Sequence, residues 1–94
     1  MKKKILVTRK LLIENEEKLK ELFDVRLNSK DELYTSDKII ELSKDCDGIL
    51  SAITDQFNKD LIEKLTPSIK IIANFAVGFG NIDISAATKK NIVI

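Results

Sequence analysis

Short apolar runs alternate with longer amphipathic stretches along the chain. The runs are typical of buried strands, and they predict strands over residues 4–8, 24–28, 49–53, 69–73 and 92–94. The stretches between them repeat apolar residues at helical spacing, which predicts helices over residues 11–23, 36–43, 58–65 and 83–90. Strands and helices that alternate with short connections indicate an α/β domain with a parallel, doubly wound sheet.

Local signals refine these elements. The inner side of the first helix is expected to hold Leu11, Leu12, Asn15, Leu19, Leu22 and Phe23. Ser36 and Asn58 suit the starts of the second and third helices, because short polar side chains cap free N–H groups there. Asn81 and Asp83 suit the start of the fourth helix for the same reason.

Five strands favour a flavodoxin-like, three-layer αβα arrangement with the strand order 2-1-3-4-5. Ligands of such sheets bind beyond the carboxyl ends of the strands, near the point where the strand order reverses. The segments Thr8–Lys10, Ile53–Gln56 and Phe75–Gly80 all follow strands on that edge. The chain ends inside the fifth strand and shows no closing helix, so we expect a truncated domain with exposed apolar surface at this edge.

Composition removes several classes of function. The chain has sixteen basic and fifteen acidic residues, which gives a net charge of +1. It therefore has no large excess of positive charge that would favour binding to a nucleic acid or a membrane surface. No run approaches the roughly 20 apolar residues of a membrane span, and the apolar run after Lys4 is too short for a secretory signal. The single cysteine, Cys46, predicts a small buried side chain in a reducing compartment, the cytoplasm.

The chain contains no histidine. This excludes Ser-His-Asp and Cys-His nucleophilic sites and metal sites that contain histidine. The acidic residues are scattered at the spacing of solvent-facing helix surfaces, so the sequence predicts no metal site and no catalytic residue in this chain.

A glycine-containing loop follows the fourth predicted strand, with Gly78 and Gly80 in a Gly-x-Gly pattern. The third glycine of a dinucleotide-binding fingerprint would stand at position 83, which is Asp83, so the pattern does not predict a dinucleotide site. Main-chain N–H groups of Ala76, Val77 and Gly78 could form a small anion site there. A plain structural turn explains the same residues equally well.

Residues 71–83, which read Ile-Ile-Ala-Asn-Phe-Ala-Val-Gly-Phe-Gly-Asn-Ile-Asp, resemble the D-isomer-specific 2-hydroxyacid dehydrogenases. Residues 86–93 continue the likeness. Upstream, Asp47–Leu50, Thr54-Asp55 and Leu61-Ile62 also fit, and they favour the glyoxylate/hydroxypyruvate reductase branch. The resemblance covers the whole chain and is specific from about Asp47 onward.

The resemblance implies that residues 1–94 are a single, partial substrate (catalytic) domain. It implies that main-chain N–H groups of Val77 and Gly78, beside Ala76, hold the carboxylate of a small 2-keto or 2-hydroxy acid, and that Ile53 lines the pocket. Phe79 stands where tyrosine is commoner and Gly80 where an aspartate or asparagine is usual, which loosens the expected loop.

The family's nicotinamide-binding Rossmann domain, with its catalytic arginine, glutamate and histidine, has no counterpart in this chain. The resemblance therefore implies an oxidoreductase that uses NAD or NADP as a full-length homodimer, while the 94-residue chain binds no cofactor and is inactive alone. An alternative from another class is a stand-alone flavodoxin-like regulatory or interaction module without catalysis.

Overall fold

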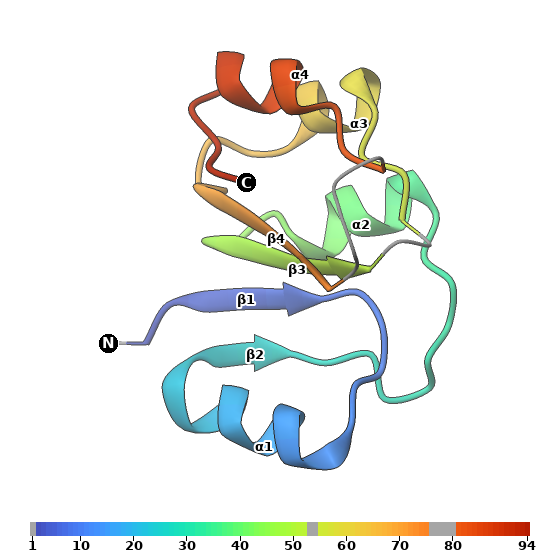
Figure 1. The fold of residues 1–94 in the computed structure, drawn as a ribbon, viewed down its shortest axis with the longest axis vertical. Coiled ribbons are helices and arrows are strands. Elements are labelled where there is room, and N and C mark those ends of the chain that lie inside the picture. Colours follow the sequence, from blue (N-terminus) through green and yellow to red (C-terminus); the bar gives the residue numbers. More distant parts are fainter. Residues whose placement is uncertain (1, 53–54, 76–80) are drawn as a thin grey trace.

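The computed structural model describes residues 2–52, 55–75 and 81–94, where strands and helices alternate along the chain (Figure 1). The strands are β1 (Lys4–Val7), β2 (Asp24–Arg26), β3 (Gly48–Ala52) and β4 (Ile71–Phe75). The helices are α1 (Ile13–Leu22), α2 (Ser36–Leu42), α3 (Lys59–Lys64) and α4 (Ile84–Lys89). No helix in these ranges is long and apolar enough to cross a membrane.

The sheet is parallel throughout and has the strand order β2-β1-β3-β4. This confirms the parallel α/β architecture and the first four places of the predicted order. The described residues form four strands and not five, which corrects the prediction. Val93 makes a single parallel bridge to Ile71 of β4, with Ile72 N donating to Val93 O at 2.8 Å. The last residues therefore lie beside β4, where the fifth strand was expected, but they pair at one position only.

One face of the sheet carries the core. Leu6, Ile49 and Ile72 are almost completely buried on three neighbouring strands. They belong to one apolar cluster with residues from the three helices that follow β2, namely Ile39, Leu61, Ile62, Ala86 and Ala87. This cluster fixes α2, α3 and α4 against the sheet.

Helix α1 is packed more loosely than its sequence predicted. It contains no buried residue, and Leu12 and Leu22 are 70% and 57% exposed. The helix leads into β2, an edge strand of three residues whose only inward side chain, Val25, is half-buried. This short edge offers little apolar area. Of the predicted inner residues, Leu11, Leu19 and Phe23 are partly covered, and the prediction for Leu12, Asn15 and Leu22 was wrong.

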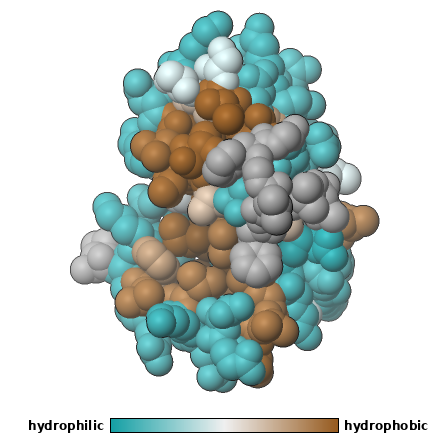
Figure 2. Space-filling model, in the orientation of Figure 1, coloured by the Kyte–Doolittle hydropathy of each residue, from teal (hydrophilic) through white to brown (hydrophobic). Residues whose placement is uncertain are grey.

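Apolar surface is also exposed at the β4 edge of the sheet, where the last residues of the chain lie. Ile71 is 45% exposed and Val93 is 63% exposed. Figure 2 shows brown, apolar surface on this face of the molecule, both near the C-terminal segment and over the strands. The expectation of exposed apolar surface at this edge is confirmed.

Several boundaries differ by a few residues from the sequence prediction, and two of the differences have a visible cause. β4 begins at Ile71 and not at Ile69, because Ile69 is held in a turn, with its N–H donating to Thr66 O at 3.1 Å. The N-cap of α2 is Thr35 and not Ser36, since the Thr35 side chain accepts from Lys38 N at 3.2 Å. Asn58 caps α3 as expected, through Leu61 N at 2.9 Å.

Candidate functional site at the carboxyl ends of the strands

Buried polar side chains gather where β1, β3 and β4 end, at the arrowheads of Figure 1. Thr8 follows β1 and is 0% exposed, and Asp55 follows β3 and is 3% exposed. Asn81, which follows β4, is 6% exposed, and Ser51 within β3 is 1% exposed. Polar groups cost free energy when they are buried without partners, so their hydrogen bonds define what this region does.

Asp55 joins the ends of β1 and β3. Its carboxylate oxygen Oδ2 accepts a short hydrogen bond from Thr8 Oγ1 and a second from Ala52 N at 2.9 Å. The Asp55 main-chain N–H also donates to Ala52 O at 2.9 Å. The carboxylate thus fixes the exit of β3 against β1, where the strand order reverses.

Asn74 and Asn81 join the two ends of the loop that follows β4. Asn74 Nδ2 donates to Asn81 Oδ1 at 2.7 Å, and Asn81 Nδ2 lies 3.3 Å from Asn74 Oδ1. Asn81 Nδ2 also donates to two carbonyl oxygens of the neighbouring loop, Asp55 O at 2.9 Å and Ala52 O at 3.1 Å. Ser51 Oγ adds a bond to Asn74 Oδ1 at 3.0 Å. The Asn81 side chain therefore contacts Ala52 and Asp55, on either side of residues 53–54, as well as Asn74.

A separate set of contacts holds the chain after β1. The Arg9 guanidinium forms two hydrogen bonds with the Asp31 carboxylate, at 2.7 and 3.1 Å, and Lys10 N donates to Asp31 Oδ1 at 2.9 Å. These contacts lower the pKa of Asp31 to about 2, chiefly through the Arg9 hydrogen bond and then through the Lys10 N–H. Asn28, itself buried, donates to Thr8 O at 2.9 Å and to Glu32 O at 2.7 Å.

The four residues that the sequence assigned to substrate binding lie outside the described residues: Ile53, Ala76, Val77 and Gly78. The structure does define the residues on either side of them. Ala52 and Phe75 are directly paired in the sheet, and Phe57 and Ile82 are paired again beyond the loops. The residues that flank the two segments therefore lie at neighbouring points of the fold. The assignment of both segments to one site stays a prediction.

Sequence reasoning missed the residues that hold these ends. It placed Asp55 only within a loop segment at this edge of the sheet and Asn81 at a helix start, whereas both are buried in the polar network. The prediction for Asn81 was wrong because the cap of α4 is Asp83, whose Oδ1 accepts from Ala86 N at 3.0 Å. The one signal in the sequence is that two asparagines, 74 and 81, flank the glycine-containing segment.

The described residues show no fit to a dinucleotide or a metal. The Asp83 carboxylate lies at the start of α4, the helix end at which a pyrophosphate would approach, and like charges repel there. No group of three or more cysteine, aspartate or glutamate residues in the described ranges is arranged to hold a metal ion. The chemistry visible in this region is hydrogen bonding by carboxylate, hydroxyl, amide and main-chain groups.

Comparison with known proteins gives the family. Residues 5–94 match the family described as D-isomer specific 2-hydroxyacid dehydrogenase, catalytic domain. The chain therefore belongs to this family. It is 40% identical, over 95 residues, to the glyoxylate reductase of Korarchaeum cryptofilum, and 31% identical, over 93 residues, to the glycerate dehydrogenase of Hyphomicrobium methylovorum.

Solved structures agree with the fold. The PH0520 protein of Pyrococcus horikoshii has a TM-score of 0.84 and 29% identity, with 98% of this chain and 26% of that chain covered. An NADPH-dependent glyoxylate/hydroxypyruvate reductase of Sinorhizobium meliloti, solved with NADP and malonate, has a TM-score of 0.73 and 27% identity, with 98% of this chain and 27% of that chain covered. All of this chain aligns with the Korarchaeum protein but spans only 28% of that protein's length.

Proposed function

We propose that this chain is the substrate-binding part of an NAD(P)-dependent D-2-hydroxyacid dehydrogenase that reduces a small 2-keto acid such as glyoxylate or hydroxypyruvate. Family membership over residues 5–94 supports the reaction class. The Korarchaeum and Sinorhizobium proteins, both named for glyoxylate reduction, support the substrate class.

The observation that carries the proposal is the pairing of the two loop-bearing strands. Ala52 ends β3 and Phe75 ends β4, and the two are register partners, so the residues that precede the two assigned segments are neighbours in the sheet. In the proposed site the main-chain N–H groups of Ala76, Val77 and Gly78 bind the substrate carboxylate and Ile53 lines the pocket. Main-chain N–H groups suit this task because they bind an anion without titrating.

The remaining chemistry belongs to other parts of the proposed enzyme. A bound nicotinamide would supply the hydride, and a general acid would protonate the carbonyl oxygen. This chain has no histidine for that second role, so the 94 residues alone are expected to bind substrate without turnover. The proposal includes a homodimeric full-length enzyme in the cytoplasm, which suits the buried, unpaired Cys46.

An NMR titration of the ¹⁵N-labelled chain with glyoxylate tests this proposal. We expect saturable amide shifts at Ile53, Ala76, Val77 and Gly78, and weaker shifts with acetate, which has a carboxylate but no 2-keto group. A variant Gly78→Pro removes one N–H from the site and should lose most of the glyoxylate response. The matched variant Val77→Ala keeps its N–H and should retain it.

A folded spectrum in which glyoxylate moves no amide in these segments would contradict a carboxylate site formed by this chain. That outcome would favour the stand-alone regulatory or interaction module. Equal shifts with glyoxylate and acetate would retain the anion site and remove the 2-keto specificity.

A further inference from the structure

The two faces of the sheet are covered unequally. Helices α2, α3 and α4 pack on the core face, and they connect strands in the direction from β2 toward β4. Helix α1 connects β1 to β2, which is the opposite direction along the sheet, so a right-handed connection places it on the second face. Val7 points to this second face, because it is completely buried and yet lies outside the core cluster. Figure 1 shows α1 at the β2 end of the sheet, so no described helix lies over β3 and β4 on the second face.

Two rows of paired residues cross the second face, and both consist of apolar residues and one glycine. Strand pairing aligns one row across four segments: Ile5, Gly48, Ile71 and Val93. It aligns the other row across three strands: Val7, Leu50 and Ala73. A Cβ at Gly48 would lie 3.1 Å from Ile5 Cδ1 and 2.8 Å from Ile71 Cγ2, so both side chains lie on the face to which that Cβ would point.

Exposure rises along both rows from β1 to the β4 edge. Val7 is buried, Leu50 is half-buried and Ala73 is exposed. In the other row, Ile71 and Val93 are 45% and 63% exposed. Parallel sheets normally have both faces covered, whereas Figure 2 shows brown, apolar surface over these strands. The residues without cover form what we call the open half of the sheet: Gly48, Leu50, Ile71, Ala73 and Val93.

We propose that two copies of the chain associate face to face through the open half of the sheet. The chain exposes 5996 Å², whereas a folded monomer of 10.6 kDa exposes about 5,500 Å². Two copies that each bury the excess of about 500 Å² form an interface of about 1,000 Å², the lower limit for a specific interface. The open half contains no charged residue, and a net charge of +1 causes little repulsion between copies. The association uses none of the residues assigned to substrate binding, so it goes beyond the proposed function and does not depend on it.

The first test compares Ile71→Lys with Ile84→Lys in sedimentation equilibrium over a series of chain concentrations. Ile84 is a matched control, because it is 47% exposed and belongs to α4, the helix on the core face. We expect a monomer–dimer equilibrium in the wild type. Ile71→Lys should weaken it by at least about tenfold, since a two-fold interface contains the change twice, and Ile84→Lys should leave it unchanged.

Three outcomes of this test overturn the proposal. They are a wild type that stays monomeric at every concentration, an equal loss of dimer in both variants, and assembly of the wild type beyond a dimer. A monomeric wild type would leave the open half to a partner other than a second copy. Circular dichroism shows whether each variant is folded. If Ile71→Lys does not fold, Val93→Lys, at the exposed end of the same row, takes its place.

The second test locates the interface without a substitution. In a mixture of ¹³C-labelled and unlabelled chains, isotope-filtered NMR detects only contacts between copies. We expect these contacts at the methyl groups of Leu50, Ile71 and Val93. Contacts between copies that omit these three residues would place the dimer on another surface and overturn the proposal, while the proposed substrate-binding function would be unaffected.

Discussion

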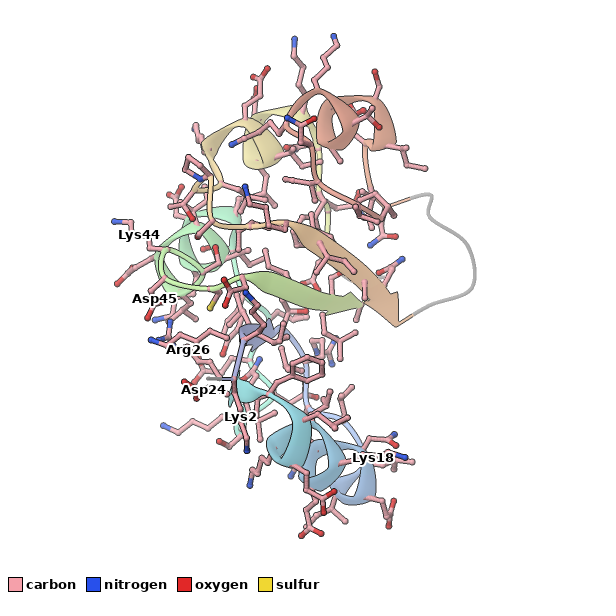
Figure 3. The ribbon with its side chains drawn as sticks, turned by 90° about the vertical axis from the view of Figure 1, so that its left-hand side faces the viewer. Lys2, Lys18, Asp24, Arg26, Lys44 and Asp45 are labelled. Atoms are coloured by element: carbon pink, nitrogen blue, oxygen red, sulfur yellow. The ribbon has the colours of Figure 1, made fainter. Side chains whose placement is uncertain are left out.

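Polar residues at the amino ends of the strands are charged and exposed, whereas those at the carboxyl ends are buried. At the amino ends, Asp45 lies between Lys4 and Arg26, with N–O distances of 3.1 Å to Lys4 and 3.0 and 3.1 Å to Arg26. All three side chains are between 42% and 49% exposed, and Figure 3 shows Arg26 and Asp45 next to one another at this end. At the carboxyl ends, Thr8, Asp55 and Asn81 are buried, and their side-chain partners are carboxylate, hydroxyl, amide and main-chain groups.

This difference decides where substitutions matter. Exposed ion pairs contribute little to folding, because water and salt screen them and ordering two long side chains costs entropy. Buried polar groups make a larger difference when one partner is removed, because the other partner is left without a hydrogen bond away from water. Every buried side-chain nitrogen and oxygen in the described part of the chain has a partner. The carboxyl ends therefore hold a defined geometry, whereas the exposed charged side chains at the amino ends tolerate change.

Asp55→Ala should give the largest effect. It would leave Thr8 Oγ1 and Ala52 N without their acceptor in a buried region, at a cost of about 3 kcal/mol in the free energy of unfolding. Chemical denaturation monitored by circular dichroism measures this loss. Asp55→Asn keeps an acceptor oxygen at the same place and should lose about half as much. An Asp55→Ala loss below that of Asp45→Asn would break the comparison between the two ends.

Gly48→Ala should rank second, because it places an atom at the tightly packed start of β3. A Cβ at Gly48 would lie 2.8 Å from Ile71 Cγ2 and 3.2 Å from Ile71 O. Relief of this overlap should cost about 1–2 kcal/mol, measured in the same denaturation experiment. The double variant with Ile71→Ala removes the closest atom, so it should lose less than the sum of the two single variants. Strict additivity would show that the overlap relaxes without Ile71.

Asp45→Asn should change stability least of the three. It removes both ion pairs at the amino ends, but every partner is exposed and can be rehydrated. We expect a difference in melting temperature close to the scatter of repeat measurements, and smaller still in 0.5 M salt. Arg26 and then Lys4 hold the pKa of Asp45 well below its usual range, so any stabilisation is present above about pH 4 and is lost as the pH falls further. A loss that equals the Asp55→Ala loss would mean that the amino ends are as constrained as the carboxyl ends.

Arg9→Gln should lower stability at neutral pH only slightly, because the ion pair is partly exposed, and the difference from wild type should disappear as the pH falls to about 2. The Arg9 hydrogen bond is the main cause of the low Asp31 pKa of about 2, so its loss should raise that pKa toward the ordinary value of about 3.9. Because the folded pKa lies below the unfolded one, the unfolded chain binds more protons between these values, and wild-type stability should fall as the pH drops from about 4 to 2. NMR titration of the Asp31 side chain measures the shift. A pKa that stays near 2 in the variant would assign the effect to Lys10 N instead.

Much of the fold could be predicted because it depends on local patterns. The four described strands and four helices follow the apolar periodicities, and the caps at Asn58 and Asp83 follow residue type. The burial of α1 could not be predicted in this way. Leu12 and Leu22 have helical spacing, but the three-residue β2 offers them too little surface to cover.

The sequence by itself determined the alternating strands and helices, the parallel sheet and the family, because short-range periodicity and motif residues carry that information. The tertiary structure alone decided that Asp55 and Asn81 are buried connectors and not a loop aspartate and a helix cap. The physical reason is distance along the chain: Thr8 and Asp55, or Ala52 and Asn81, meet only after the strands have paired. No local sequence pattern encodes these long-range contacts.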